Sequence, residues 1–215
     1  MRLQLALDSD LASSMAVLAQ VHPYVDIVEV GTPLIFREGM KAVRELRAAH
    51  PQLTLLADLK IMDAGEEEAA IAFDAGADMV TVLGAAHDVT VQGAVRAARH
   101  SGKQTLADML QVGSPQTRAD ELLALGCDYL CVHTAYDLHG SGAAPFAQLQ
   151  RLRDRLPAAP LAVAGGINLE TLEGVLAFEP AIVIVGGAIT RAAQPAAIAR
   201  MMHERVHTWQ TTRNW

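Results

Sequence analysis

The chain has 215 residues, of which 51% are hydrophobic and 19% charged, so it carries enough apolar material for the core of one large domain. Its formal charge of −7 disfavours binding to nucleic acids or anionic membranes, although a local site could still bind an anionic small molecule. No signal peptide and no apolar run of membrane-spanning length is found, so we expect a cytoplasmic protein.

Short apolar segments recur along the whole chain, and each is continuously apolar rather than alternating. Parallel strands that are buried on both faces have this pattern. We expect strands at 3–7, 25–30, 53–57, 79–83, 105–109, 129–132, 161–164 and 182–185. The sixth of these segments begins near Cys127 and contains Cys131, and we expect both thiols to be buried as small apolar groups.

Amphipathic segments separate the expected strands. We expect helices at 11–21, 39–50, 66–75, 90–101, 116–125, 145–156, 169–176 and 195–206. Eight strand–helix units in 215 residues, about 27 residues each, predict a closed (β/α)8 barrel, the TIM barrel, over residues 1–206. An open doubly wound sheet is the alternative fold. Residues 207–215 show no clear period, and we expect a C-terminal tail there that is a candidate for disorder.

Ionisable residues stand at or near the ends of several expected strands. The active site of such a barrel lies at the carboxyl ends of its strands, and buried charges are costly unless they are paired. These positions therefore indicate chemistry rather than folding. They are Asp8, Glu29, Asp58, Asp108 and His133, with Lys60 and Asp63 shortly after Asp58.

The third expected strand ends in a charged segment, Asp58-Leu59-Lys60. Two charges two residues apart share one face of an extended segment, so Lys60 could stay protonated and stabilise a developing anion, or form only a structural ion pair. Glu29 and Asp58 on adjacent strands could share Mg²⁺, which prefers oxygen ligands; alternatively, Glu29 pairs with Lys60. His133 directly follows the sixth expected strand, and histidine is a residue type that suits proton transfer near neutral pH.

Pairs of glycines follow the last two expected strands, at Gly165-Gly166 and Gly186-Gly187. The loops after strands seven and eight are the usual phosphate site of such barrels. Glycine lets backbone N–H groups approach a phosphate closely, and the N-terminus of a following helix adds a favourable dipole. These loops therefore predict a phosphate site, the alternative being that they are tight turns only.

Three segments, 5–8 (LALD), 27–33 (IVEVGTP) and 57–63 (ADLKIMD), resemble the orotidine 5′-monophosphate decarboxylase suprafamily and its D-x-K-x-x-D motif. The resemblance covers roughly residues 1–206 and is strongest to the 3-hexulose-6-phosphate synthases and the 3-keto-L-gulonate-6-phosphate decarboxylases. It extends through 80–84, 132–134, 162–167 and 183–190. The decarboxylases have arginines where this chain has Tyr136 and Gly187, which favours the synthases.

This resemblance implies roles for the candidate residues. Glu29 and Asp58 would bind Mg²⁺, Lys60 and the metal would stabilise a cis-enediolate, and His133 would transfer protons. The glycine loops would hold the sugar phosphate. The family is dimeric, which implies a homodimer in which Asp63 reaches the neighbouring subunit's site. The full set of catalytic candidates is Asp8, Lys60, Asp63, Asp108 and His133.

The implied activity is that of a carbon–carbon lyase of the aldehyde-lyase class. Its reaction would be a Mg²⁺-dependent aldol condensation of formaldehyde with D-ribulose 5-phosphate that gives 3-hexulose 6-phosphate. The alternatives are decarboxylation of 3-keto-L-gulonate 6-phosphate to L-xylulose 5-phosphate, a related lyase or isomerase reaction on another sugar phosphate, and non-catalytic sugar-phosphate binding. Orotidine 5′-monophosphate decarboxylase activity is disfavoured, because its second lysine–aspartate array is not found.

Overall fold

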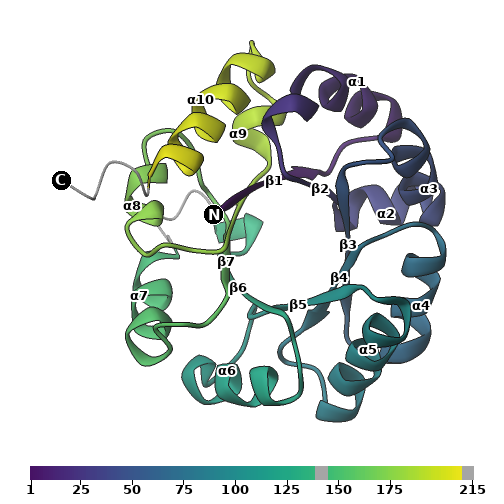
Figure 1. Ribbon diagram of the computed structural model, residues 1–215, viewed down its shortest axis with the longest axis vertical. Helices are drawn as coiled ribbons and strands as arrows, with labels where there is room; N and C mark the ends of the chain where they lie inside the picture. The colour runs from purple at the N-terminus through teal and green to yellow at the C-terminus, as the bar shows by residue number, and fades with distance from the viewer. Residues whose placement is uncertain (139–144, 210–215) are drawn as a thin grey trace.

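A computed structural model describes residues 1–138 and 145–209 of the chain. Eight parallel strands form a closed barrel in sequence order, with β8 paired to β1, and helices surround it (Figure 1). This confirms the predicted (β/α)8 barrel and excludes the open sheet. The strands are β1 (Arg2–Leu7), β2 (Ile27–Val30), β3 (Thr54–Ile61), β4 (Met79–Leu83), β5 (Gln104–Asp108), β6 (Tyr129–His133), β7 (Leu161–Ala164) and β8 (Ile182–Val185).

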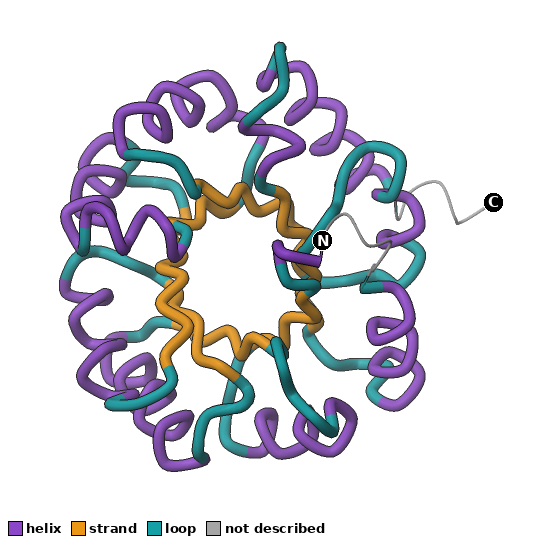
Figure 2. The backbone as a smooth tube through the Cα atoms, turned by 180° about the vertical axis from the view of Figure 1, so that it is seen from behind, coloured by secondary structure: helices purple, strands orange, loops and turns teal. Residues whose placement is uncertain are grey.

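The helices form the outer ring, which Figure 2 shows around the ring of strands. All eight expected helices are present, with ends within three residues of the predicted ones: α1 (Leu11–Val21), α3 (Met40–Ala49), α4 (Gly65–Asp74), α5 (Asp88–Ser101), α6 (Pro115–Ala124), α7 (Phe146–Arg155), α8 (Leu172–Leu176) and α10 (Pro195–Thr208). Four short helices of the described residues were not predicted: α2 (Thr32–Glu38), α9 (Gly187–Thr190), and the 3-10 turns η1 (His22–Tyr24) and η2 (Tyr136–Leu138). No helix of the described residues is long and apolar enough to span a membrane.

Two separate apolar clusters hold the barrel together. The larger lies between the strands and the helices, and it takes up every second strand residue, such as Leu3, Leu5 and Leu7 of β1. The smaller fills the barrel interior and consists of Ala6, Ile27, Leu56, Met79, Leu106, Cys131, Ala162, Ala164, Ile182 and Ile184. Both cysteines are free and buried, as predicted, and burial raises the pKa of Cys127 to about 11.

Three aspartates brace the amino-terminal end of the barrel. Each directly precedes an even-numbered strand and accepts a hydrogen bond from a backbone N–H of the preceding odd-numbered strand. The donor–acceptor distances are 2.7 Å from Leu3 to Asp26, 3.0 Å from Leu55 to Asp78 and 2.8 Å from Thr105 to Asp128. These contacts join neighbouring strands at the end opposite the expected active site.

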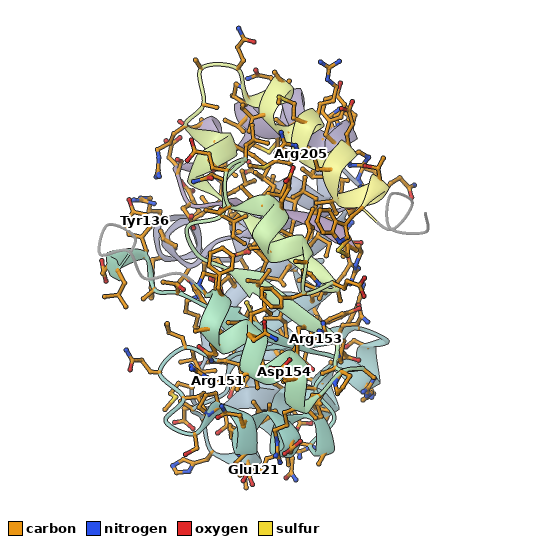
Figure 3. The ribbon with its side chains drawn as sticks, turned by 90° about the vertical axis from the view of Figure 1, so that its left-hand side faces the viewer. Glu121, Tyr136, Arg151, Arg153, Asp154 and Arg205 are labelled. Carbon is orange, nitrogen blue, oxygen red and sulfur yellow. The ribbon has the colours of Figure 1, made fainter. Side chains whose placement is uncertain are left out.

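The last helix, α10, continues to Thr208, and Trp209 is the last described residue. The barrel boundary predicted at residue 206 therefore falls inside α10. Of the predicted tail, 207–208 are helical and 210–215 lie outside the described residues. Arg205, labelled in Figure 3, ties α10 to the loop after β7 by donating to the carbonyl oxygen of Leu169 at 2.9 Å.

Candidate active site

A layer of polar side chains lies directly above the apolar barrel interior, toward the carboxyl ends of the strands. Side chains two residues apart on a strand share one face, so each polar residue follows an interior apolar residue by two positions. The pairs are Ala6 and Asp8, Ile27 and Glu29, Leu56 and Asp58, Met79 and Thr81, Leu106 and Asp108, and Cys131 and His133. The strand pattern alone thus brings most of the candidate residues to one mouth of the barrel.

Asp58 is the centre of this layer and is buried. Its Oδ1 accepts a hydrogen bond from Thr81 Oγ1 at 2.7 Å. Its Oδ2 accepts from Lys60 Nζ at 2.6 Å and from Thr32 Oγ1 at 2.7 Å. With three donors directed at its two oxygens, this carboxylate is suited to hold its negative charge in a buried place.

The Lys60 backbone is not extended, contrary to the prediction. The register with β4 shifts between Ala57 and Ile61, and Lys60 has a φ of 49°. Its backbone N–H donates to Thr81 Oγ1 at 2.8 Å, which fixes the bulge. A left-handed residue other than glycine costs about 1–2 kcal/mol, and such strain is typical of functional sites. The predicted meeting of Asp58 and Lys60 is confirmed, but a bulge rather than strand alternation produces it.

Lys60 connects Asp58 to a second acidic residue, Asp108, across the barrel mouth. Lys60 Nζ lies 3.4 Å from Asp108 Oδ2, and the same oxygen lies 2.8 Å from His133 Nδ1. Burial alone would lower the pKa of Lys60, but the charges of Asp58 and Asp108 raise it well above its usual value. Lys60 is therefore a permanent cation near neutral pH.

His133 is oriented by Asp108. Burial alone would raise the pKa of Asp108, but the hydrogen bond from His133 and the charges of His133 and Lys60 lower it below its usual value. Asp108 Oδ1 also accepts from the backbone N–H of Leu110 at 3.0 Å. Because Nδ1 of His133 is held by the Asp108 carboxylate, Nε2 is the nitrogen that can exchange a proton with a substrate.

Glu29 is an acidic residue of the layer whose charge is poorly compensated. Its Oε2 accepts a hydrogen bond from Gln4 Nε2 at 2.6 Å, and no described residue donates to its other oxygen. The neighbouring Oε1 of Gln4 is buried without a partner. Burial, and then the charge of Asp58, raises the pKa of Glu29 to about 8. The alternative that Glu29 pairs directly with Lys60 is not observed among the described contacts.

The Asp8 carboxylate lies between two glycines. A Cβ at Gly31 would collide with the Asp8 carboxylate, and a Cβ at Gly186 would lie 3.6 Å from its Oδ2. Burial, and then the charge of Asp58, raises the pKa of Asp8. The Asp8 side chain thus lies between the other residues of the polar layer and the loop after β8.

The glycine loops after β7 and β8 have the properties that a phosphate site needs. Gly165 and Gly166 have φ values of 102° and 69°, and a Cβ at Gly165 would overlap the backbone of Thr134. In the described part of the chain, the N–H groups of Gly165, Gly166 and Gly187 donate no hydrogen bond. The predicted helix N-terminus follows only the β8 loop, as the one-turn α9, because α8 starts six residues after Gly166.

Arg191, at the end of α9, lies beside the second glycine loop. A side chain at Gly187 would collide with its guanidinium, so the glycine leaves room for this cation. Arg191 is exposed, and its charge also acts on Asp8. The absence of an arginine at position 187 therefore does not leave the strand-eight loop without a guanidinium group.

Asp63 is the one predicted catalytic residue that the structure does not bring to the layer. It is exposed on the loop after β3, and its Oδ1 accepts from the backbone N–H of Ala64 at 2.8 Å. Its role across a subunit interface stays a prediction.

Four residues that contact or adjoin the layer were missed in the sequence: Gln4, Thr32, Thr81 and Arg191. Gln4 and Thr81 are polar residues at inward-facing strand positions, and this signal could have identified them. Thr32 lies in α2 and Arg191 directly follows α9, two short helices that were not predicted, so their positions carried no comparable signal.

Comparison with known proteins places this architecture in a family. Residues 1–202 match the model of the orotidine 5′-phosphate decarboxylase / HUMPS family. A 3-hexulose-6-phosphate synthase of Bacillus subtilis is 47% identical over 96% of this chain and 99% of its own length, and 3-hexulose-6-phosphate synthase 3 of Staphylococcus saprophyticus is 44% identical with the same coverage. The crystal structure of 3-hexulose-6-phosphate synthase from Salmonella typhimurium superposes with a TM-score of 0.94 at 42% identity, covering 97% of this chain and 99% of that one.

Proposed function

Because the chain belongs to the orotidine 5′-phosphate decarboxylase / HUMPS family, we propose that it condenses formaldehyde with D-ribulose 5-phosphate to give 3-hexulose 6-phosphate. The protein is an enzyme, a carbon–carbon lyase, and its full-length relatives are named for this synthesis. The observation that carries the proposal is the connected set of Asp58, Lys60, Asp108 and His133 at the barrel mouth. This set provides a permanent cation beside an oriented proton carrier.

Glu29 and Asp58 are the residues that would hold Mg²⁺. The donor set fits, because both are carboxylates on adjacent strands, and Glu29 is buried with an oxygen that has no described donor. A divalent cation next to Glu29 would also offset the burial cost that raises its pKa to about 8. Mg²⁺ bound there would supply positive charge to the two adjacent oxygens of a ketose phosphate as negative charge develops on them.

The protein residues account for the movement of protons. His133 Nε2 takes the proton from C1 of ribulose 5-phosphate, and the electron pair moves into an enediolate whose charge rests on the C2 oxygen. The Lys60 ammonium stabilises this charge in a site already organised for it by Asp58 and Asp108. C1 then forms a bond to the formaldehyde carbon as the C2 carbonyl re-forms, and the aldehyde oxygen takes the proton held by His133 Nε2 and becomes the new hydroxyl group. The sum of the two reactants gives the product without loss of atoms.

The phosphate group of the substrate binds at the glycine loops. The N–H groups of Gly165, Gly166 and Gly187 have no described acceptor and can donate to phosphate oxygens. Arg191 adds a guanidinium beside Gly187, and the planar fork of its N–H donors can bind two phosphate oxygens at once. The reactive end of the substrate then lies toward Lys60 and His133.

Asp63 belongs to the proposal through a homodimer. It is exposed and apart from the acidic layer of its own chain, which suits a residue that completes the neighbouring subunit's site. Sedimentation of the purified protein should therefore show a dimer. Mixing inactive Asp63→Asn and Lys60→Ala proteins under conditions of subunit exchange should restore part of the activity, because some sites would receive both native residues. Absence of restored activity in a confirmed heterodimer would show that Asp63 acts within its own chain.

The decisive experiment follows formaldehyde loss in the presence of ribulose 5-phosphate and Mg²⁺. We expect rapid loss that EDTA abolishes and that added Mg²⁺ restores. A parallel reaction with 3-keto-L-gulonate 6-phosphate measures CO₂ release. Faster turnover of this second substrate would replace the proposed reaction with decarboxylation, and binding of both sugar phosphates without turnover would support a non-catalytic binder.

A further inference from the structure

A second cluster of metal-ligating side chains lies at the amino-terminal end of the barrel, opposite the acidic layer. Asp26 precedes β2, and His203 and His207 lie one turn apart on the same face of α10. One ligand atom from each residue lies within 4.8 Å of the other two. None of the three takes part in the proposed reaction.

The hydrogen bonds of the two histidines leave their Nε2 atoms available. His203 Nδ1 lies 3.1 Å from the carbonyl oxygen of Tyr24, and His207 Nδ1 lies 2.9 Å from the carbonyl oxygen of His203. A carbonyl can only accept, so both Nδ1 atoms carry hydrogen, and in a neutral ring Nε2 then holds a lone pair. Histidines that bind metals have this arrangement, with the other nitrogen donating to a carbonyl or carboxylate.

Asp26 differs from Asp78 and Asp128 in its charged partners. Among the described residues, no arginine or lysine pairs with Asp26. Asp78 pairs with Arg47 and Lys103, and Asp128 pairs with Arg99, so a permanent cation from the helical layer lies on each. At Asp26 this place is taken by His207, whose Nε2 lies 3.4 Å from Oδ1. The His207 ring stacks on the His203 ring at a centroid distance of 4.0 Å. When the His207 ring is neutral, its Nε2 lone pair, rather than a permanent positive charge, faces this carboxylate.

We propose that Asp26, His203 and His207 bind a divalent transition-metal ion of the Zn²⁺ type, with water in the remaining position. Two imidazoles and one carboxylate suit Zn²⁺, whereas Mg²⁺ prefers oxygen ligands alone. Ligands around a tetrahedral Zn²⁺ with bonds of about 2.0–2.2 Å lie about 3.3–3.6 Å apart. The three side chains are partly or fully exposed and can close to this separation by small rotations.

The ion would link α10 to the segment that precedes β2. Asp26 already holds β1 through the backbone N–H of Leu3, at 2.7 Å. A metal bond from Asp26 to α10 would extend this contact across the junction where the ring of helices closes. Because the site is at the amino-terminal end of the barrel, its role is stability rather than catalysis.

The test is a zinc titration by calorimetry of metal-free protein in the presence of excess Mg²⁺. The wild type should bind one more Zn²⁺ per chain than His203→Ala, His207→Ala or Asp26→Asn, in which the amide oxygen still accepts from Leu3. His100→Ala is the matched control, because His100 is an exposed histidine on α5. At free Zn²⁺ about 100 times the dissociation constant, the melting temperature of the wild type should rise by roughly 5–10 °C.

The outcomes are distinguishable from those of the proposed reaction. Formaldehyde consumption by the His207→Ala protein, assayed with Mg²⁺ alone, should match the wild type whether or not the metal site exists. If the wild type and the three variants bind the same number of Zn²⁺ ions with the same affinity, Asp26 and His207 form only an ion pair and the proposal is overturned. A His207→Gln variant gives the same decision should the alanine variant fail to fold.

Discussion

The two ends of the barrel use the same kinds of charged residue in opposite ways. At the amino-terminal end, burial alone would raise the pKa of Asp78, but hydrogen bonds from Lys103 and the Leu55 N–H, together with Arg47, lower it. At the carboxyl end, burial raises the pKa of Glu29 to about 8, and Lys60 compensates it only in part. A fully paired carboxylate stabilises the fold, whereas an incompletely paired one keeps a local cost where a ligand can offset it.

The amino-terminal end is also the more regular of the two. Arg47 of α3 donates to the carbonyl oxygens of Gly76 at 3.0 Å and Leu53 at 2.8 Å. Arg153 of α7, labelled in Figure 3, makes the corresponding contacts to Phe178 at 2.9 Å and Ala159 at 3.0 Å. The polar residues of the layer at the other end are of four kinds, Asp, Glu, Thr and His, and their hydrogen-bond partners differ from strand to strand. Regularity at one end and diversity at the other is what a stable scaffold with a specialised site requires.

The sharpest test of this contrast removes one lysine from each end. Lys60→Ala takes away the cation that stabilises the developing charge, so kcat should fall by about 10³-fold. Lys103→Ala at the amino-terminal end removes a partner of Asp78, and it should leave kcat within about twofold while lowering the melting temperature by a few degrees. The measurements are formaldehyde consumption and thermal unfolding followed by circular dichroism.

The kcat of the Lys103→Ala protein could contradict this difference between the two ends of the barrel. If Lys103→Ala lowered kcat as strongly as Lys60→Ala in folded protein, the amino-terminal charges would act on the reaction and the division between the two ends would be wrong.

The next effect in size concerns stability. Asp78→Asn removes the charge that Arg47 and Lys103 share but keeps an oxygen for the Leu55 N–H. Loss of these charged hydrogen bonds should lower the free energy of unfolding by about 2 kcal/mol and the melting temperature by about 4–8 °C. Asp154→Asn, at an exposed acid of α7 bonded to Gln150, is the control and should change stability by less than about 0.5 kcal/mol. Equal losses of unfolding free energy in the two variants would mean that the charged pairs of Asp78 stabilise the protein no more than an exposed surface contact does.

The regular parts of this molecule were the ones that the sequence could predict. Continuous apolar strands and amphipathic helices follow from burial, so all eight units were located. The same periodicity predicted that Glu29, Asp58, Asp108 and His133 lie at one mouth of the barrel, because all strands of a parallel barrel point the same way.

Irregular backbone was what the sequence could not predict. The left-handed Lys60 depends on a hydrogen bond to Thr81, a residue twenty-one positions away on the next strand. Neither α2 nor α9 has enough residues for a helical period to be visible, so Thr32 and Arg191 were not expected near the site. Local irregularities of this kind depend on tertiary contacts, and these determine the final position of the catalytic cation.

The pH dependence of stability should differ between the two ends. In metal-free protein the pKa of Glu29 is near 4.5 unfolded and about 8 folded, so the folded state holds more protons between these values. Stability should therefore fall as the pH rises through this window, by at most about 1.4 kcal/mol per pH unit from this group. Glu29→Gln should remove that slope. Asp78, whose pKa is lowered, acts in the opposite sense, and its contribution is lost only as the pH falls through and below 3.8.

Urea unfolding of the wild type and Glu29→Gln at several pH values, in EDTA, measures this difference. If the free energy of unfolding has the same pH dependence in the two proteins, Glu29 is ionised in the folded state without metal. Its charge would then be compensated by the neighbouring protein groups.

The smallest expected effect concerns Arg191, which is exposed and adjoins the glycine loop rather than the reacting atoms. Arg191→Ala should raise the KM for ribulose 5-phosphate about fivefold, corresponding to about 1 kcal/mol for an exposed charge, and leave kcat nearly unchanged. Added salt should reduce the difference from the wild type, since exposed charges are screened. Arg200→Ala, at an exposed arginine of α10, is the matched control and should leave KM unaltered. A fall in kcat with constant KM would instead show that the Arg191 charge acts on the developing enediolate, as it acts on the pKa of Asp8. Arg191 would then belong to the catalytic residues.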